Sequence, residues 1–183
     1  MAAVTGPDEP ILEFVLDHRT PWFDTTMRAV TSLGGFWVLT LVCVAFAVGW
    51  RWRVGDWSAA IVLAVVSALA WWSCNSLKLA FGRARPDLAD RLVAAGGYSF
   101  PSGHATQSAA IWGTLALFVA RRFPEHRRAV WAVGVGLAVA VGSSRIYLGV
   151  HWFTDVVAGW TLGVAFVGVT ALLLSRRPAT GGR

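Results

Sequence analysis

Long apolar stretches alternate with short polar ones along most of this chain. Charged residues mark off five apolar runs, at residues 33–50, 57–77, 102–120, 129–144 and 156–175. A helix needs roughly 20 apolar residues to cross the hydrocarbon of a bilayer, and backbone groups in lipid must find their partners within the same segment. The pattern therefore predicts an all-α, polytopic bundle of five transmembrane helices, in which the run at 129–144 is short.

The first 32 residues follow a different pattern. Charged side chains such as Glu13 interrupt the apolar positions, so this stretch is too polar to span a membrane. A helix is expected to begin at Thr20-Pro21, because proline suits the first helical position. We expect residues 1–32 to form one or two short helices at the membrane interface, ahead of a transmembrane domain over residues 33–183. A sixth, imperfect span in this segment is the alternative.

The composition agrees with a membrane protein. Hydrophobic residues make up 56% of the chain and charged residues only 14%, too few for the surface of a soluble domain. The net charge is +6, and nearly all of the basic residues are arginines. These arginines form short clusters between apolar runs, as in membrane loops, rather than a stripe beside stacking aromatic residues. The expected partner is the membrane, and nucleic acid is not expected.

Three groups of polar residues stand at the ends of the apolar runs. They are Lys78 with Arg85-Pro86, the stretch Pro101-Ser102-Gly103-His104, and Ser144-Arg145 with His151 and Asp155. Successive spans alternate in direction, so the second and fourth runs end on the side of the membrane where the third and fifth begin. All three groups fall at those ends, and we expect them to meet in one pocket.

The cations of these groups predict a site for an anion. Lys78, Arg85 and Arg145 would repel one another in a pocket that held no negative charge. The planar fork of Arg suits phosphate oxygens, and Lys supplies a point charge. Ser102 and Gly103 open a predicted helix, whose free N–H groups also bind phosphate.

The two histidines predict chemistry on that anion. His151 and Asp155 are four residues apart, so on a helix they share a face. Asp155 can then accept a hydrogen bond from one ring nitrogen and leave the other free to attack. His104 comes from another helix and suits proton transfer near neutral pH. These three side chains could in principle hold Zn²⁺, but the neighbouring cations would repel it, so we expect no metal and no cofactor.

The three groups together resemble the signature of the type 2 phosphatidic acid phosphatase (PAP2) superfamily. That signature is Lys-x6-Arg-Pro, Pro-Ser-Gly-His and Ser-Arg-x5-His-x3-Asp, and every spacing is kept in this sequence. The resemblance implies a membrane enzyme that hydrolyses a lipid phosphate. Substrates in the superfamily include phosphatidic acid, phosphatidylglycerol phosphate and polyprenyl diphosphates.

The resemblance also implies a role for each motif residue. His151 attacks phosphorus and forms a phosphohistidine, Asp155 orients His151, and His104 protonates the leaving alkoxide and later activates water. The phosphate oxygens are held by Lys78, Arg85, Ser102, Gly103 and Arg145. Two further residues, Arg83 and Asn75, lie near the site but outside the motifs. Each can contact the substrate, and the alternatives are solvation in the loop for Arg83 and helix packing for Asn75.

Two other classes of protein fit parts of this pattern. Vanadium haloperoxidases and soluble acid phosphatases share the motifs, but five apolar runs argue against a soluble protein. A non-enzymatic lipid-phosphate binding or transport protein would need the same anion site. It would need neither a nucleophile nor a proton donor, and the presence of His151 and His104 therefore favours the enzyme. No feature of the sequence predicts an oligomeric state.

The basic residues predict which way the chain is inserted, because short loops rich in Lys and Arg stay in the cytoplasm. One side of the predicted bundle holds Arg51, Arg53, Arg121, Arg122, Arg127, Arg128, Arg176, Arg177 and Arg183, and the other holds Arg19, Arg28, Lys78, Arg83, Arg85, Arg91 and Arg145. Setting aside the three cations assigned to phosphate leaves nine against four. We expect a plasma membrane protein whose active site faces the extracytoplasmic side.

Overall fold

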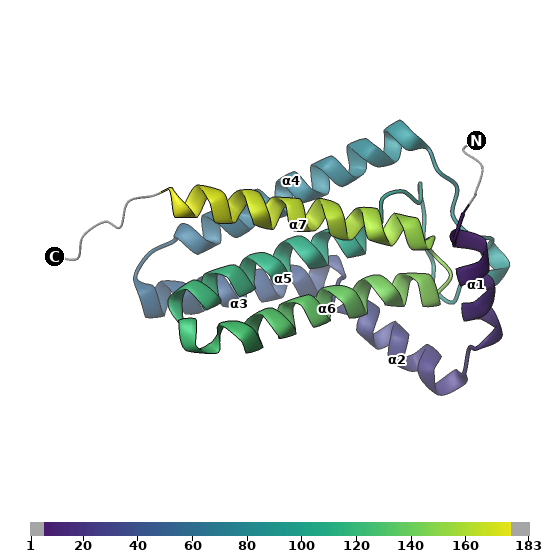
Figure 1. Cartoon of the computed structure of the whole chain (residues 1–183), viewed down its shortest axis with the longest axis horizontal. Coiled ribbons are helices and arrows are strands. Elements are labelled where there is room, and N and C mark those ends of the chain that lie inside the picture. The colour runs from purple at the N-terminus through teal and green to yellow at the C-terminus, as the bar shows by residue number, and fades with distance from the viewer. Residues whose placement is uncertain (1–5, 177–183) are drawn as a thin grey trace.

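The computed structural model describes residues 6–176 as a bundle of α-helices (Figure 1). Within this range there are seven α-helices and two short 3-10 helices, and no strand. The α-helices are α1 (Asp8–Asp17), α2 (Pro21–Ser32), α3 (Phe36–Val54), α4 (Ser58–Phe81), α5 (Gly103–Arg122), α6 (Arg127–Tyr147) and α7 (Phe153–Ser175). The five apolar runs of the sequence correspond to α3 through α7, which confirms the all-α fold class.

Four of the long helices are long and apolar enough to cross a membrane. They are α3, α4, α7, and α6 together with the turn before it, over Pro124–Tyr147. The run at 129–144, expected to be short, is extended at both ends to the 21 residues of α6. The expected number of five spans stays a prediction, because α5 is not one of the four.

The fifth long helix, α5, lies at the centre of the bundle and packs against α3, α4, α6 and α7. Polar residues along it, among them Thr106, Ser108 and Thr114, are fully buried. Since neighbouring helices and not lipid surround these positions, α5 tolerates a more polar composition than a lipid-facing helix. Small residues allow the close approach: a Cβ on Gly163 of α7 would lie 2.6 Å from the Cβ of Ala109.

The N-terminal segment forms two short helices, α1 of 10 residues and α2 of 12. As expected, α2 begins directly after Thr20 with Pro21 in its first turn. Both helices pack on the bundle where α6 ends and α7 begins. Arg19, between them, donates to the carbonyl of Tyr147 at 2.6 Å and to that of Asp90 at 2.8 Å. The segment is therefore tied to the bundle, while its position at a membrane interface stays a prediction.

The opposite end of the bundle carries the arginine clusters. α3 and α5 end there, α6 begins there, and α7 ends at Ser175. One contact between these elements is the bond from Arg121 Nη2 to the carbonyl of Leu174, at 3.3 Å. Two arginines used in the orientation argument, Arg177 and Arg183, lie outside the described residues.

Candidate active site

The side chains of the three motifs lie at one end of the bundle. α4 ends at Phe81, α5 begins at Gly103, α6 ends at Tyr147 and α7 begins at Phe153. The loop between α4 and α5 crosses this end, and α1 is next to it (Figure 1). The alternating direction of the helices thus brings the three motifs to the same end, as the sequence predicts.

His151 and Asp155 approach each other at the start of α7, where Nδ1 of His151 lies 3.3 Å from Oδ2 of Asp155. The expectation that both sit on one helical face was wrong, because α7 begins at Phe153 and His151 precedes it. The contact forms because Asp155 is the third residue of the helix. From there its carboxylate reaches back and also accepts the N–H of Trp152 at 3.0 Å.

The carboxylate of Asp155 is fully buried and surrounded by donors. Its Oδ1 accepts a bond from Arg83 Nη1 at 2.7 Å. Its Oδ2, which faces His151, also accepts the hydroxyl of Ser99. With both oxygens satisfied, the carboxylate is held in one orientation, with Oδ2 toward the imidazole.

The other ring nitrogen of His151 faces a cation. Arg85 Nη1 lies 3.0 Å from Nε2 of His151 and donates to the carbonyl of Val150 at 2.6 Å. Burial lowers the pKa of His151 to about 3; Asp155 opposes this effect, and Arg85 and Arg145 add to it. The imidazole is therefore neutral near pH 7. With Nδ1–H directed at Asp155, its Nε2 carries a lone pair.

Arg85 itself is fixed by the loop between α4 and α5. Its guanidinium donates to three successive carbonyls, those of Gly96, Gly97 and Tyr98, at 3.0, 3.0 and 3.2 Å. The pKa of Arg85 is lowered, by burial first and then by Arg91, but an arginine remains charged. Arg85 therefore stands as a positive charge preorganised beside Nε2 of His151.

The other two cations of the motifs, Lys78 and Arg145, lie at the same end of the bundle. Lys78 Nζ, at the end of α4, donates to the carbonyls of Tyr98 and Ser99 at 2.8 and 3.3 Å. Arg145 is buried near the end of α6 and donates from Nη1 to Thr31 Oγ1 of α2 at 2.9 Å. Its Nε is buried without a hydrogen-bond partner among the described residues, as expected of a donor that serves an anion.

Ser102 and Gly103 open α5 as the sequence predicts. Gly103 is the first residue of the helix, so its N–H has no partner within the helix. The N–H of Ser102 is occupied by the carbonyl of Asp155 at 2.9 Å. The Ser102 hydroxyl is buried and unpaired within residues 6–176. Ser102 can therefore offer a ligand its hydroxyl, and Gly103 its backbone N–H.

His104, in the first turn of α5, lies between this cluster and an apolar cavity. Arg145, His151, Arg85 and Lys78 are all close enough to act on it electrostatically. His104 and Lys78 also line a cavity of about 880 Å³ between α3, α4 and α5. The polar cluster and the cavity are therefore continuous through these two side chains.

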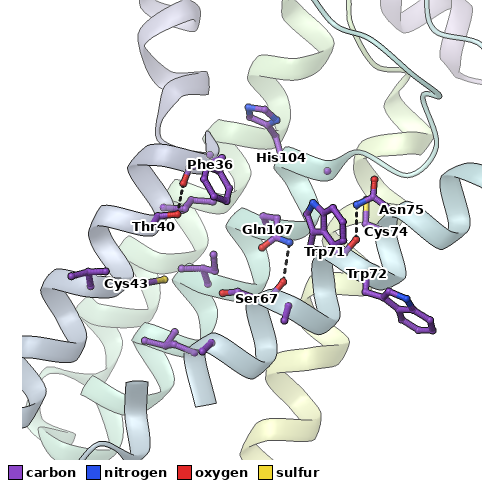
Figure 2. A pocket seen from close by; sticks show the side chains of 18 of the residues that line it. Phe36, Thr40, Cys43, Ser67, Trp71, Trp72, Cys74, Asn75, His104 and Gln107 are labelled. Carbon is purple, nitrogen blue, oxygen red and sulfur yellow. Dashed lines mark hydrogen bonds between the residues drawn. The ribbon is translucent and has the colours of Figure 1, made fainter. Parts of the chain in front are cut away.

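The cavity walls are mainly apolar, and Figure 2 shows most of the side chains that line the cavity. Leu39 of α3, Leu63 of α4 and Ile111 of α5 contribute to it, and Trp71 and Trp72 of α4 are both more than half exposed. Gln107 crosses between α5 and α4 by donating to the carbonyl of Ser67 at 3.2 Å (Figure 2). The sequence did not predict this cavity, because it depends on how three helices are placed relative to one another.

An alternative use of His104, His151 and Asp155 would be a zinc site. In the part of the chain that the structure describes, no group of three or more His, Cys, Asp or Glu side chains is placed to hold a metal ion. Apart from Asp155, the charged groups next to the two histidines are cations, which favour an anion.

Sequence reasoning missed some of the residues around His151. Ser99, which contacts Asp155, belongs to no motif. Arg83 was left between a substrate contact and solvation, and it contacts Asp155 instead. Asn75 lines the cavity and also donates to the carbonyl of Trp71 at 2.8 Å, so it has both a structural contact and access to the cavity.

Comparison with known proteins assigns the chain to a family. The model of the PAP2 superfamily matches residues 57–179. Phosphatidylglycerophosphatase B of Bacillus subtilis (strain 168) is 34% identical over 165 residues, which cover 88% of this chain and 80% of that protein. An undecaprenyl-diphosphatase of Sulfolobus acidocaldarius is 43% identical over 74 residues, 39% of this chain and 32% of that protein.

A solved structure agrees over nearly the whole chain. The transmembrane PAP2 type phosphatidylglycerolphosphate phosphatase from Bacillus subtilis superposes with a TM-score of 0.92 at 29% identity, covering 99% of this chain and 90% of that one. The relatives are membrane lipid phosphatases, and the three motifs of the family meet here in one site. This chain therefore belongs to the PAP2 superfamily.

Proposed function

We propose that this protein is an integral membrane phosphatase that removes a phosphate group from a lipid through a phosphohistidine on His151, without a metal ion. The observation that carries the proposal is the environment of His151. Asp155 holds its Nδ1, and Arg85 lies 3.0 Å from its Nε2. A neutral, oriented imidazole beside a fixed cation suits attack on phosphorus.

The reaction begins with binding of the phosphate group. Its oxygens are held by Lys78, Arg85, Arg145, the hydroxyl of Ser102 and the N–H of Gly103. These groups offset the charge that spreads over the oxygens in the transition state, a task that Mg²⁺ performs in many other phosphoryl-transfer enzymes. In this protein the cationic side chains supply the compensating positive charge, so no metal ion is required.

Two displacements then complete the turnover. The Nε2 lone pair of His151 forms a bond to phosphorus while the bond to the lipid oxygen breaks, and His104 protonates the departing alkoxide. Neutral His104 next takes a proton from water, whose oxygen attacks phosphorus as the P–N bond breaks. Inorganic phosphate leaves and His151 is neutral again.

The apolar cavity supports a lipid rather than a small phosphate ester as the substrate. It begins at Lys78 and His104 and continues between α3, α4 and α5. A head group at the cations would place an acyl or prenyl chain along these apolar walls, where it would exchange lipid contacts for protein contacts without exposure to water. The names of the relatives point to phosphatidylglycerol phosphate or a polyprenyl diphosphate as first candidates.

The test is phosphate release by the purified protein from phosphatidic acid, phosphatidylglycerol phosphate, a polyprenyl diphosphate and glycerol 3-phosphate. The wild type should act on one or more of the lipids, in excess EDTA as well, and poorly on glycerol 3-phosphate. His151→Ala should abolish release, while His126→Ala, an exposed histidine at the opposite end, should not. Lipid binding without release by the wild type would instead support a binding or transport protein. Loss of activity in EDTA that Mg²⁺ restores would contradict the metal-free reaction.

We also propose the arrangement in the membrane that the sequence predicts. Residues 1–32 would lie at the interface and residues 33–183 would form the transmembrane domain. The site would face the extracytoplasmic side of the plasma membrane. The distribution of arginines between the two ends of the bundle supports this orientation.

A further inference from the structure

Arg83 connects two buried carboxylates that are far apart in the sequence. Its Nη1 lies 2.7 Å from Oδ1 of Asp155, and its Nη2 lies 2.6 Å from Oδ2 of Asp8 in α1. The side chains of Asp8 and Asp155 are 1% and 0% exposed, and that of Arg83 is 13% exposed. Buried charges of this kind are stable only when they are paired, and removing one partner is costly.

Thr154 completes the connection. Asp8 accepts the N–H of Thr154 at 2.8 Å and its hydroxyl at 2.7 Å. The same hydroxyl accepts a bond from Arg83 Nη1 at 2.7 Å. Since Thr154 is the second residue of α7, Asp8 satisfies a free N–H at the start of the helix that carries Asp155.

The side chain of Arg83 is occupied by groups other than those assigned to phosphate. Both of its terminal nitrogens are engaged by Asp8, Thr154 and Asp155. Burial lowers the pKa of Arg83, but Asp8 and Asp155 outweigh this and raise it. Its carbonyl accepts the N–H of Ser99 at 2.8 Å, and the Ser99 hydroxyl contacts Asp155. The backbone and side chain of Arg83 thus act on the same carboxylate.

We propose that Arg83 and Asp8 are positioning residues for the nucleophile. Arg83 holds Oδ1 of Asp155 so that Oδ2 stays directed at His151, and Asp8 holds Arg83. Through Asp8, the short helix α1 then helps to orient the active site. This proposal rests on the proposed function of His151, but its test includes a readout that does not require turnover.

Arg83→Met leaves two buried carboxylates without their cationic partner and removes the donor that holds Oδ1 of Asp155. We expect kcat to fall roughly 10- to 100-fold, the range typical of outer partners that orient a functional group. KM for the lipid and binding of inorganic phosphate should stay near the wild-type values, because Arg83 does not touch the phosphate. Vanadate, which can adopt the five-coordinate geometry of the transition state, should bind more weakly in proportion to the loss of kcat/KM.

Two further variants separate positioning from folding. Asp8→Asn should lower kcat less than Arg83→Met, because Arg83 keeps Asp155 as a partner. The double variant Asp8→Asn/Arg83→Met removes one charge of each sign, so it should recover thermal stability without recovering kcat. Glu9→Gln and Arg28→Met replace exposed residues of α1 and α2 and are the matched controls. Both should behave like the wild type.

The experiment measures kcat and KM by phosphate release, vanadate and phosphate binding by calorimetry, and melting temperature. Wild-type kcat and vanadate affinity in a folded Arg83→Met or double variant would overturn the proposal. Weaker phosphate binding would also overturn it, because Arg83 would then be a phosphate ligand. If the wild type proves inactive, the proposed function fails, and the ratio of vanadate to phosphate affinity still tests whether Arg83 orients His151.

Discussion

The imidazole of His151 is buried in a cluster of cations and is neutral near pH 7. Burial lowers its pKa to about 3, against an ordinary value near 6.5. Between these two values the unfolded chain binds a proton on His151 that the folded protein does not. The folded state therefore loses stability as the pH falls through this range, by at most about 1.4 kcal/mol per pH unit.

This burial predicts a measurable pH dependence of stability. The melting temperature of the wild type should fall more between pH 7 and pH 5 than that of His151→Asn, which cannot titrate but can still donate to Asp155. His126→Asn, at an exposed histidine, should follow the wild type. An equal loss in the wild type and His151→Asn would mean that folding does not lower the pKa of His151.

The spacing of the motifs predicted that His104, His151 and Asp155 lie at the same end of the bundle, because spans that alternate in direction bring their ends together. The local structure at His151 could not be predicted in the same way. The pair was expected on a helical face, whereas Asp155 reaches back from the third position of α7. The contacts of Arg83 with Asp8 and Asp155 join residues about 75 positions apart, and no local pattern marks such a pairing.

At the scale of the helices, the apolar cavity beside α4 predicts how the hydrocarbon chain of the lipid is recognised. Ala68 lines the cavity, whereas Val65 on the same helix is exposed elsewhere. Ala68→Trp should fill the space next to Trp72 and raise KM for a long-chain lipid phosphate. It should have little effect on a short-chain analogue, because the head group binds at the other end.

The matched control for this substitution is Val65→Trp, which adds a large side chain outside the cavity. Phosphate release is measured for both variants on lipids of two chain lengths. If Ala68→Trp raised KM equally for the long-chain and short-chain lipids, the hydrocarbon chain of the lipid would not lie in this cavity. The same conclusion would follow if Val65→Trp had the same effect as Ala68→Trp.

The helices themselves were largely predictable, and the exception is informative. The apolar runs predicted the cores of α3 to α7, since a lipid-facing helix must be apolar along its length. α5 departs from this rule because neighbouring helices cover Thr106, Ser108 and Thr114. Burial by protein instead of lipid cannot be read from composition alone. The cavity between α3, α4 and α5 is also a tertiary property.

At the scale of the whole molecule, the structure sharpens the argument about orientation. Four basic residues at the active-site end were counted after the phosphate ligands had been set aside: Arg19, Arg28, Arg83 and Arg91. The side chain of Arg83 is now accounted for by its two carboxylate partners. This leaves three basic residues against the nine that the sequence assigns to the other side, of which all but Arg177 and Arg183 lie among the described residues. The positive-inside rule then favours an extracytoplasmic active site more strongly.

Single cysteines test this orientation in a Cys43→Ser/Cys74→Ser background. A cysteine at Ala94, in the loop between α4 and α5, should react with a membrane-impermeant maleimide in intact cells. A cysteine at Glu125, in the turn between α5 and α6, should react only after lysis. The reverse pattern would show that the site faces the cytoplasm.

The most direct test of the central claim is to trap the phosphoenzyme. In His104→Ala, an aryl phosphate needs no proton donor to leave, while the group that activates water is missing, so the intermediate should accumulate. The protein is quenched in alkali, where phosphohistidine survives, and its peptides are analysed by mass spectrometry. We predict a phosphate on His151, and none in the His104→Ala/His151→Ala double variant. Release of the aryl alcohol with no phosphate on His151, or with phosphate on another residue, would contradict the mechanism.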